Sequence, residues 1–268
     1  MEGITVKKKG ISIIGAFGLV FLIALIEIAL YLPLQIINRA IGHVGFSQMS
    51  SYIGVIGEVL INLLIVYWIV KRIRRKQEFN LKFEYKPKIK EYLFSVLFLF
   101  AYLFIFSNSV GMLIEKIEVS QWVVEAFDEM LMNPFVAFVS ICIIAPVFEE
   151  IIYRGIILEQ LSKRYSITTS IIVSGLIFGL IHFNLHQSVN AFFIGLILGF
   201  IYIKTNSLLL CMFWHFANNF LVFMSSMYVS DTVRGGVPGF SIVQFVFGII
   251  LFIASYKFFN KKDLIQNQ

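Results

Sequence analysis

The chain has 268 residues, of which 59% are hydrophobic and 14% are charged, and its mean hydropathy is +0.85. Soluble domains carry about 45–50% apolar and about 25% charged residues, so this composition excludes an ordinary soluble protein and indicates an integral membrane protein. The net charge of +6 does not indicate a nucleic-acid partner, because the basic residues gather at the ends of apolar segments, where they set membrane orientation. The 29 Phe residues favour lipid-facing helices over strands that alternate polar and apolar residues.

Apolar segments long enough to cross a bilayer need about 20 residues. Eight segments are candidates: 11–37, 52–70, 91–114, 135–161, 167–184, 188–203, 206–226 and 238–259. When the connecting loops are assigned alternately to the two sides, most Lys and Arg fall on the side of Lys7–Lys9. This asymmetry predicts a multi-pass, all-α protein of the cell membrane with both termini in the cytoplasm.

Residues 119–132 predict an amphipathic helix that lies on the outer membrane surface. Its apolar side chains, including Trp122 and Val123, recur at helical spacing, and three acids lie on the opposite face. Ser120 can cap its start, and Asn133–Pro134 can end it. An interface anchor and a lid over a substrate site both fit this pattern.

Glu149 and Glu150 place two carboxylates inside a long apolar run. A charge at that depth costs several kcal/mol unless it faces a bundle interior or a wet cavity. Glu150 and Arg154 are four residues apart and can form an ion pair on one helix face, which leaves Glu149 without a local cation. Pro146 removes one backbone hydrogen bond just upstream and can open the helix there. The alternative is that both acids lie at a solvated helix end without a function.

Two later apolar segments carry histidines at a comparable depth. His182 and His186 have a spacing that could ligate zinc, although the His-Glu-x-x-His pattern of zinc proteases is missing. His215 and Asn219 share a helix face and can donate hydrogen bonds to an oxyanion, or simply join helices. At 1.5 Å per residue, Glu149 and the two deeper histidines lie about 14–22 Å from the cytoplasmic helix ends, so they can meet in one layer.

These motifs resemble the CPBP family, which comprises type II CAAX prenyl endopeptidases and bacteriocin-processing or Abi membrane proteins. The family pattern Glu-Glu-x-x-x-Arg is present at Glu149–Arg154, Phe-x-x-x-His at Phe178–His182, and His-x-x-x-Asn at His215–Asn219. The resemblance covers about 135–226. We therefore divide one structural domain into N-terminal helices with the amphipathic helix (1–134), CPBP/Abi-like catalytic helices (135–226), and a last helix with a cytoplasmic tail (227–268).

The resemblance implies an eight-helix intramembrane endopeptidase and a role for each polar residue of the motifs. It assigns Glu149 and His182 to activation of the attacking water, His215 and Asn219 to stabilisation of the oxyanion, and Glu150 and Arg154 to holding the site in shape. The family is often described as metalloproteases. One Glu, two His and one Asn favour a metal-free mechanism, so no cofactor is predicted and zinc stays an alternative.

The resulting hypothesis is an endopeptidase that acts within the lipid bilayer on a peptide or a membrane-anchored protein. The substrate stays open, because the family includes prenyl-protein proteases, peptide-maturation enzymes, bacteriocin self-immunity proteins and regulators that act by binding. An ion- or proton-coupled transporter, in which Glu27, Glu58, Glu149 and the histidines form a relay, is one alternative, but the paired repeats that it predicts are not visible in the sequence. A non-catalytic scaffold for a membrane regulatory partner is the other alternative.

Overall fold

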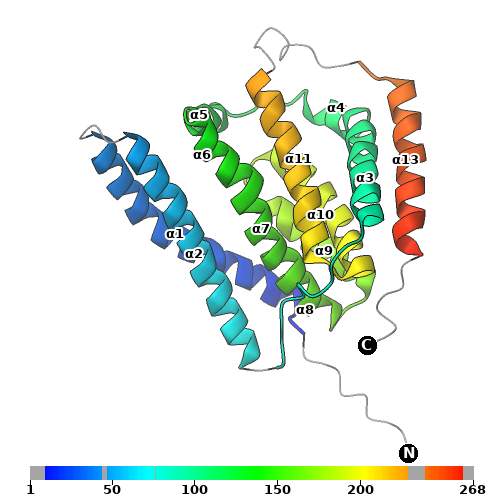
Figure 1. Ribbon diagram of the computed structural model, residues 1–268, viewed down its shortest axis with the longest axis horizontal. Helices are drawn as coiled ribbons and strands as arrows, with labels where there is room; N and C mark the ends of the chain where they lie inside the picture. Colours follow the sequence, from blue (N-terminus) through cyan, green and yellow to red (C-terminus); the bar gives the residue numbers. More distant parts are fainter. Residues whose placement is uncertain (1–9, 44–46, 76, 229–238, 262–268) are drawn as a thin grey trace, which may run out of the picture.

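The structure is a computed structural model that describes residues 10–43, 47–75, 77–228 and 239–261. Within these residues every regular element is helical, which confirms the predicted all-α class (Figure 1). The elements are α1 (Ile13–His43), α2 (Ser47–Arg74), α3 (Ile89–Ser107), α4 (Val110–Ile114), α5 (Gln121–Leu131), α6 (Pro134–Phe138), the π-helix η1 (Val139–Ile144), α7 (Ala145–Glu150), the π-helix η2 (Ile151–Leu158), α8 (Glu159–Ser162), α9 (Ile167–Leu180), α10 (Leu185–Thr205), α11 (Leu208–Tyr228) and α13 (Ile242–Asn260).

Seven helical segments of the described chain are long and apolar enough to cross a membrane, and α9 is a shorter apolar helix of 14 residues. The run from α6 to α8 counts as one of the seven, because Pro134–Ser162 forms a continuous helix. These segments confirm a multi-pass membrane protein. The cytoplasmic placement of the termini stays a prediction, and Lys7–Lys9, on which it partly depends, lie outside the described residues.

The predicted apolar segment 91–114 is broken in the structure into α3 and α4. Asn108 lies at the break, where its side-chain amide donates to the Phe104 carbonyl (2.9 Å) and its side-chain oxygen accepts the Ser241 N–H (2.6 Å). The side chain thus joins the end of α3 to the residue that precedes α13. A single Asn in an apolar run gives little sequence signal for such a break.

The predicted amphipathic helix is present as α5, although its cap differs from the prediction. Ser120 occupies the N-cap position, but its side chain makes no capping hydrogen bond. Asn133 caps the next helix, α6, by accepting the Val136 N–H (3.3 Å). Val123 is buried and Trp122 is largely exposed. A large exposed aromatic side chain suits an anchor in the membrane interface, and the lid stays a prediction.

The helices form two groups. α1 and α2 pack against each other, and Figure 1 shows this pair diverging from α6 and α7 toward the end at which α5 lies. In the larger group, α9 packs on α10 and α3 packs on α13. Its core contains the largest fully buried side chains next to the polar motifs, namely Arg154, Phe178 and Trp214.

Close packing of α9 on α10 positions the end of α9. A methyl group on Gly195 would lie 2.7 Å from the Gly175 Cα, and one on Gly179 would lie 2.6 Å from the Ser188 carbonyl oxygen. Real side chains do not tolerate such contacts, so glycine allows the two backbones to approach. His182 follows directly after this contact.

Candidate active site

The two glutamates lie on α7, a short α-helical segment between the π-helices η1 and η2. Pro146 lies at the start of α7 and supplies no backbone N–H. π-Helical turns leave backbone groups displaced from the regular ladder and occur frequently at functional sites. The bend or opening of the helix at Pro146 stays a prediction, since Pro134–Ser162 is one continuous helix, and the wider turns on both sides of α7 were not predicted.

Glu150 and Arg154 form the ion pair that their spacing predicts. The Arg154 Nη1 donates to the Glu150 Oε1 at 3.0 Å, and the two side chains are only 1% and 0% exposed. The Arg154 guanidinium also lies over the Phe178 ring, 4.5 Å from its centroid. Because the pair is shielded from solvent, removal of either partner would leave an uncompensated buried charge. Glu150 is therefore buried behind the site, where it binds Arg154 and has no contact with solvent.

His215 connects the two glutamates. Its Nδ1 lies 2.8 Å from the Glu150 Oε1, and its Nε2 lies 3.8 Å from the Glu149 Oε2. A carboxylate accepts hydrogen bonds, so the contact with Glu150 places the proton on Nδ1 and directs Nε2 toward Glu149. The second distance is too long for a direct hydrogen bond. Glu149 and His215 thus face each other across a narrow gap.

His182 lies in the turn after α9, not inside a helix as the predicted segment 167–184 implies. Phe183 has φ of 50°, which ends the helix, and Asn184 begins α10 by accepting the His186 N–H (3.0 Å). The His182 Nδ1 is 2.9 Å from the Phe178 carbonyl oxygen. His182 is therefore held by the end of α9, and no continuous helix connects it to His186.

Phe178 lies between the two histidines of the motifs. Its ring meets the His182 ring edge-on with centroids 5.3 Å apart, and it meets the His215 ring in the same way at 5.8 Å. The Phe178 side chain is fully buried. The structure thus brings together the residues of all three motifs, as their predicted common depth requires.

Asn219 lies one turn after His215 on α11, as predicted, and it also binds the π-helix η1. Its side-chain amide donates to the Ile141 carbonyl (2.9 Å), and its side-chain oxygen accepts from the Asn218 amide (3.1 Å). This contact joins α11 to η1 just upstream of the glutamates. The role of Asn219 in oxyanion stabilisation stays a prediction, because one of its two amide hydrogens already has an acceptor.

The zinc alternative does not fit the donors of the site. Among the residues that the structure describes, no three His, Cys, Asp or Glu side chains are grouped as ligands of a metal ion. Oε1 of Glu150 already binds both Arg154 and His215. Structural zinc takes four ligands and catalytic zinc takes three. The mechanism below therefore contains no step through a metal.

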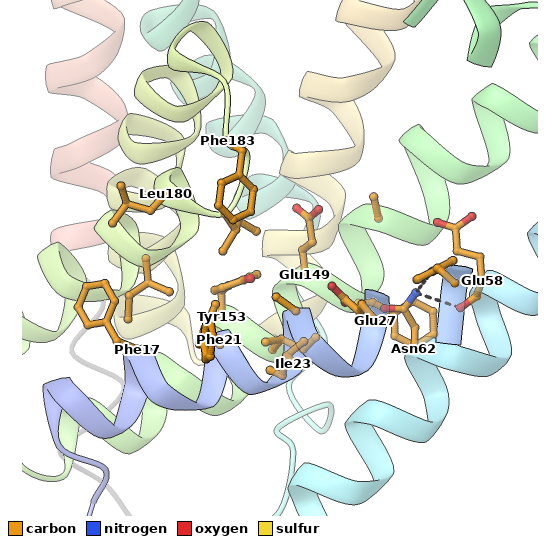
Figure 2. A pocket seen from close by; sticks show the side chains of 18 residues that line it. Phe17, Phe21, Ile23, Glu27, Glu58, Asn62, Glu149, Tyr153, Leu180 and Phe183 are labelled. Carbon is orange, nitrogen blue, oxygen red and sulfur yellow. Dashed lines mark hydrogen bonds between the residues drawn. The ribbon is translucent and has the colours of Figure 1, made fainter. Parts of the chain in front are cut away.

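Glu149 faces a cavity of about 440 Å³ that lies between α1, α2, α7, η2 and α9 (Figure 2). Its side chain is 26% exposed, in contrast to the buried Glu150. The lining is mostly apolar, but it also includes Glu27 and Glu58. The transporter alternative joins these two acids to Glu149 because all three are carboxylates in apolar segments. Their place on one cavity depends on the packing of α1 and α2, which no pattern within a single segment predicts.

The fold and the site define a multi-pass membrane protein with a buried Glu–Arg–His network beside a cavity. A family model described as type II CAAX prenyl endopeptidase Rce1-like matches residues 131–221, about a third of the chain. The match spans all the motifs, confirms the resemblance to the CPBP family, and supports protease activity of the CAAX type in general. Comparisons with curated proteins and with solved structures gave no match.

Proposed function

We propose that the protein is an intramembrane endopeptidase that hydrolyses a peptide bond of a peptide or a membrane-anchored protein. The observation that carries this proposal is the pairing of Glu149 with His215 at the wall of a cavity, with the His215 ring held by the buried Glu150. Partial exposure gives Glu149 access to water and substrate. Burial of Glu150 and Arg154 makes them suited to holding the site, not to contacting the substrate.

In the proposed reaction, Glu149 removes a proton from water as the water oxygen adds to the carbonyl carbon of the scissile bond. The protonated Glu149 then donates this proton to the amide nitrogen, the C–N bond breaks, and a carboxylic acid and an amine leave, which become a carboxylate and an ammonium group by transfer of the acid's proton to the amine. We assign orientation of the water to His182 together with Glu149, and stabilisation of the oxyanion to Asn219 and to His215, whose Nε2 donates to the oxyanion in the form of the ring that is protonated on both nitrogens. General acid–base chemistry of this kind requires a carboxylate within reach of both water and substrate.

The experiment compares peptides from membranes and medium of cells that carry the wild-type protein or Glu149→Gln at matched protein levels. We expect new peptide termini that appear only with the wild-type protein, because the amide cannot accept the proton. These termini would also identify the substrate. Identical peptide profiles in the two strains, with the wild-type phenotype intact, would contradict catalysis and favour a binding scaffold.

A further inference from the structure

Glu27 and Glu58 are two carboxylates that the proposed chemistry does not use. Glu27 lies within the apolar span Ile13–Asn38, and no described residue forms a hydrogen bond or an ion pair with its side chain. Glu58 accepts one hydrogen bond, from the Ser140 hydroxyl (2.8 Å). Carboxylates at membrane depth are costly unless they face a cavity or a partner, and they mark the paths of substrates or ions. Both acids face the cavity that Glu149 lines.

A second cavity, of about 820 Å³, adjoins the first and extends toward α5. Tyr31 and Glu58 line both cavities, so the junction between the two lies at these residues. At this point Asn62 donates to the Tyr31 hydroxyl (3.2 Å) and to the Glu58 carbonyl oxygen (3.0 Å), which joins α1 to α2. The two cavities together form a groove between the α1–α2 pair and the segment α6–α7. We call it the α1–α7 groove.

The α1–α7 groove has an apolar end and an acidic end. Figure 2 shows Phe17, Leu180 and Phe183 on one side of Glu149, and Glu27 and Glu58 on the other. This order places the candidate general base between two chemically different subsites. A bound chain that follows the groove therefore presents different side chains on the two sides of the scissile bond.

In the described part of the chain, the groove is lined by acidic side chains without basic ones. Among the described residues that line the two cavities, no Lys, Arg or His is present. Four residues of the lining carry a carboxyl group: Glu27, Glu58, Glu129 and Glu149. Charges that face each other across a site of low dielectric constant interact far more strongly than they do in water. A surface of one sign in a cleft attracts a ligand of the opposite sign. The groove therefore complements a cationic ligand.

We infer that Glu27 and Glu58 select a peptide substrate with a lysine or arginine close to the scissile bond, on the side opposite an apolar residue. This inference rests on the proposed function and adds its substrate class. Glu27 and Glu58 line the same cavity as Glu149, and an extended chain advances about 3.3 Å per residue. The basic residue thus lies within a few residues of the bond. Its N–H groups donate charge-assisted hydrogen bonds to the two carboxylates.

The test uses the purified full chain in detergent and a peptide library made by cleavage after acidic residues, so that Lys and Arg stay inside the peptides. Products are identified by mass spectrometry for the wild type, Glu149→Gln, Glu27→Gln, Glu58→Gln and Glu125→Gln. Glu125 is the matched control, because it is an exposed acid of α5 that lines neither cavity. We expect wild-type sites to be enriched in a basic residue on one side of the bond.

The strongest site is then made as a synthetic pair that differs only by Lys→Gln at the basic position. We expect Glu27→Gln and Glu58→Gln to lower kcat/KM at least about tenfold for the lysine peptide and less than about threefold for the glutamine peptide. Glu125→Gln should change neither value. Activity on the glutamine peptide also shows that each variant is folded.

Three results would overturn the inference, and they are distinguishable. If the wild type cleaves nothing that Glu149→Gln does not, the proposed function fails and the substrate class fails with it. If wild-type sites show no basic enrichment, the protease stands and the cation selectivity is wrong. If the Glu27 and Glu58 variants slow both synthetic peptides equally, these acids act on water or protons and not on the substrate side chain.

Discussion

Replacement of Glu149 by glutamine is expected to lower the turnover number of the purified protein at least about 100-fold. Glutamine keeps the shape of the side chain but cannot take a proton from water, and general acid–base catalysis typically contributes about 10²–10⁴-fold. The rate is measured at saturating concentration of a peptide that the wild type cleaves. Saturation matters because it separates loss of chemistry from loss of binding.

Two controls accompany this measurement. Glu125→Gln removes the same charge from an exposed position of α5 and should leave the rate unchanged. The midpoint of thermal unfolding of Glu149→Gln should stay close to that of the wild type, because Glu149 is partly exposed and its closest cation-forming neighbour, His215, is 3.8 Å away. A turnover number within a few-fold of the wild type would exclude Glu149 as the general base.

Replacement of Arg154 by methionine is expected to lower the free energy of unfolding by about 3–5 kcal/mol. The change leaves the Glu150 carboxylate, which is 0% exposed, without its cation, and it also removes the guanidinium from the Phe178 ring. Unfolding of the purified protein is followed by circular dichroism against temperature or denaturant. His215 alone remains beside Glu150 in the variant.

The double variant Glu150→Leu with Arg154→Met separates loss of packing from loss of charge balance. Apolar replacement of both members of a buried ion pair is often neutral or stabilising. We therefore expect the double variant to be more stable than Arg154→Met alone, although inactive because His215 loses its partner. If Arg154→Met unfolds like the wild type, the pair does not hold the site together.

The contacts between residues of the same helix in the site could be predicted from the sequence. The ion pair of Glu150 and Arg154 depends only on helical spacing, and the shared face of His215 and Asn219 does so as well. The three motifs also meet in the structure, as segments with motifs at a common depth predict, because that depth depends only on the rise per residue and on the segment ends.

The features of the site that depend on irregular backbone conformations or on packing between distant helices could not be predicted from the sequence. The helical turn of His182 ends early because Phe183 adopts a positive φ, and no glycine marks this position. The π-turns around α7 lack a sequence signature apart from Pro146. Glu27 and Glu58 join the site only because α1 and α2 pack beside it, which no periodicity within one segment can predict.

The most direct test of the central claim is hydrolysis by the purified protein in water enriched in ¹⁸O. The account predicts that the new carboxyl terminus of each wild-type product gains one ¹⁸O atom in a single turnover, and that Glu149→Gln forms no such product in the same time. ¹⁸O-labelled product formed equally fast by Glu149→Gln would contradict activation of the water by Glu149. An absence of any peptide cleavage by the wild type on substrates identified in cells would contradict the protease itself.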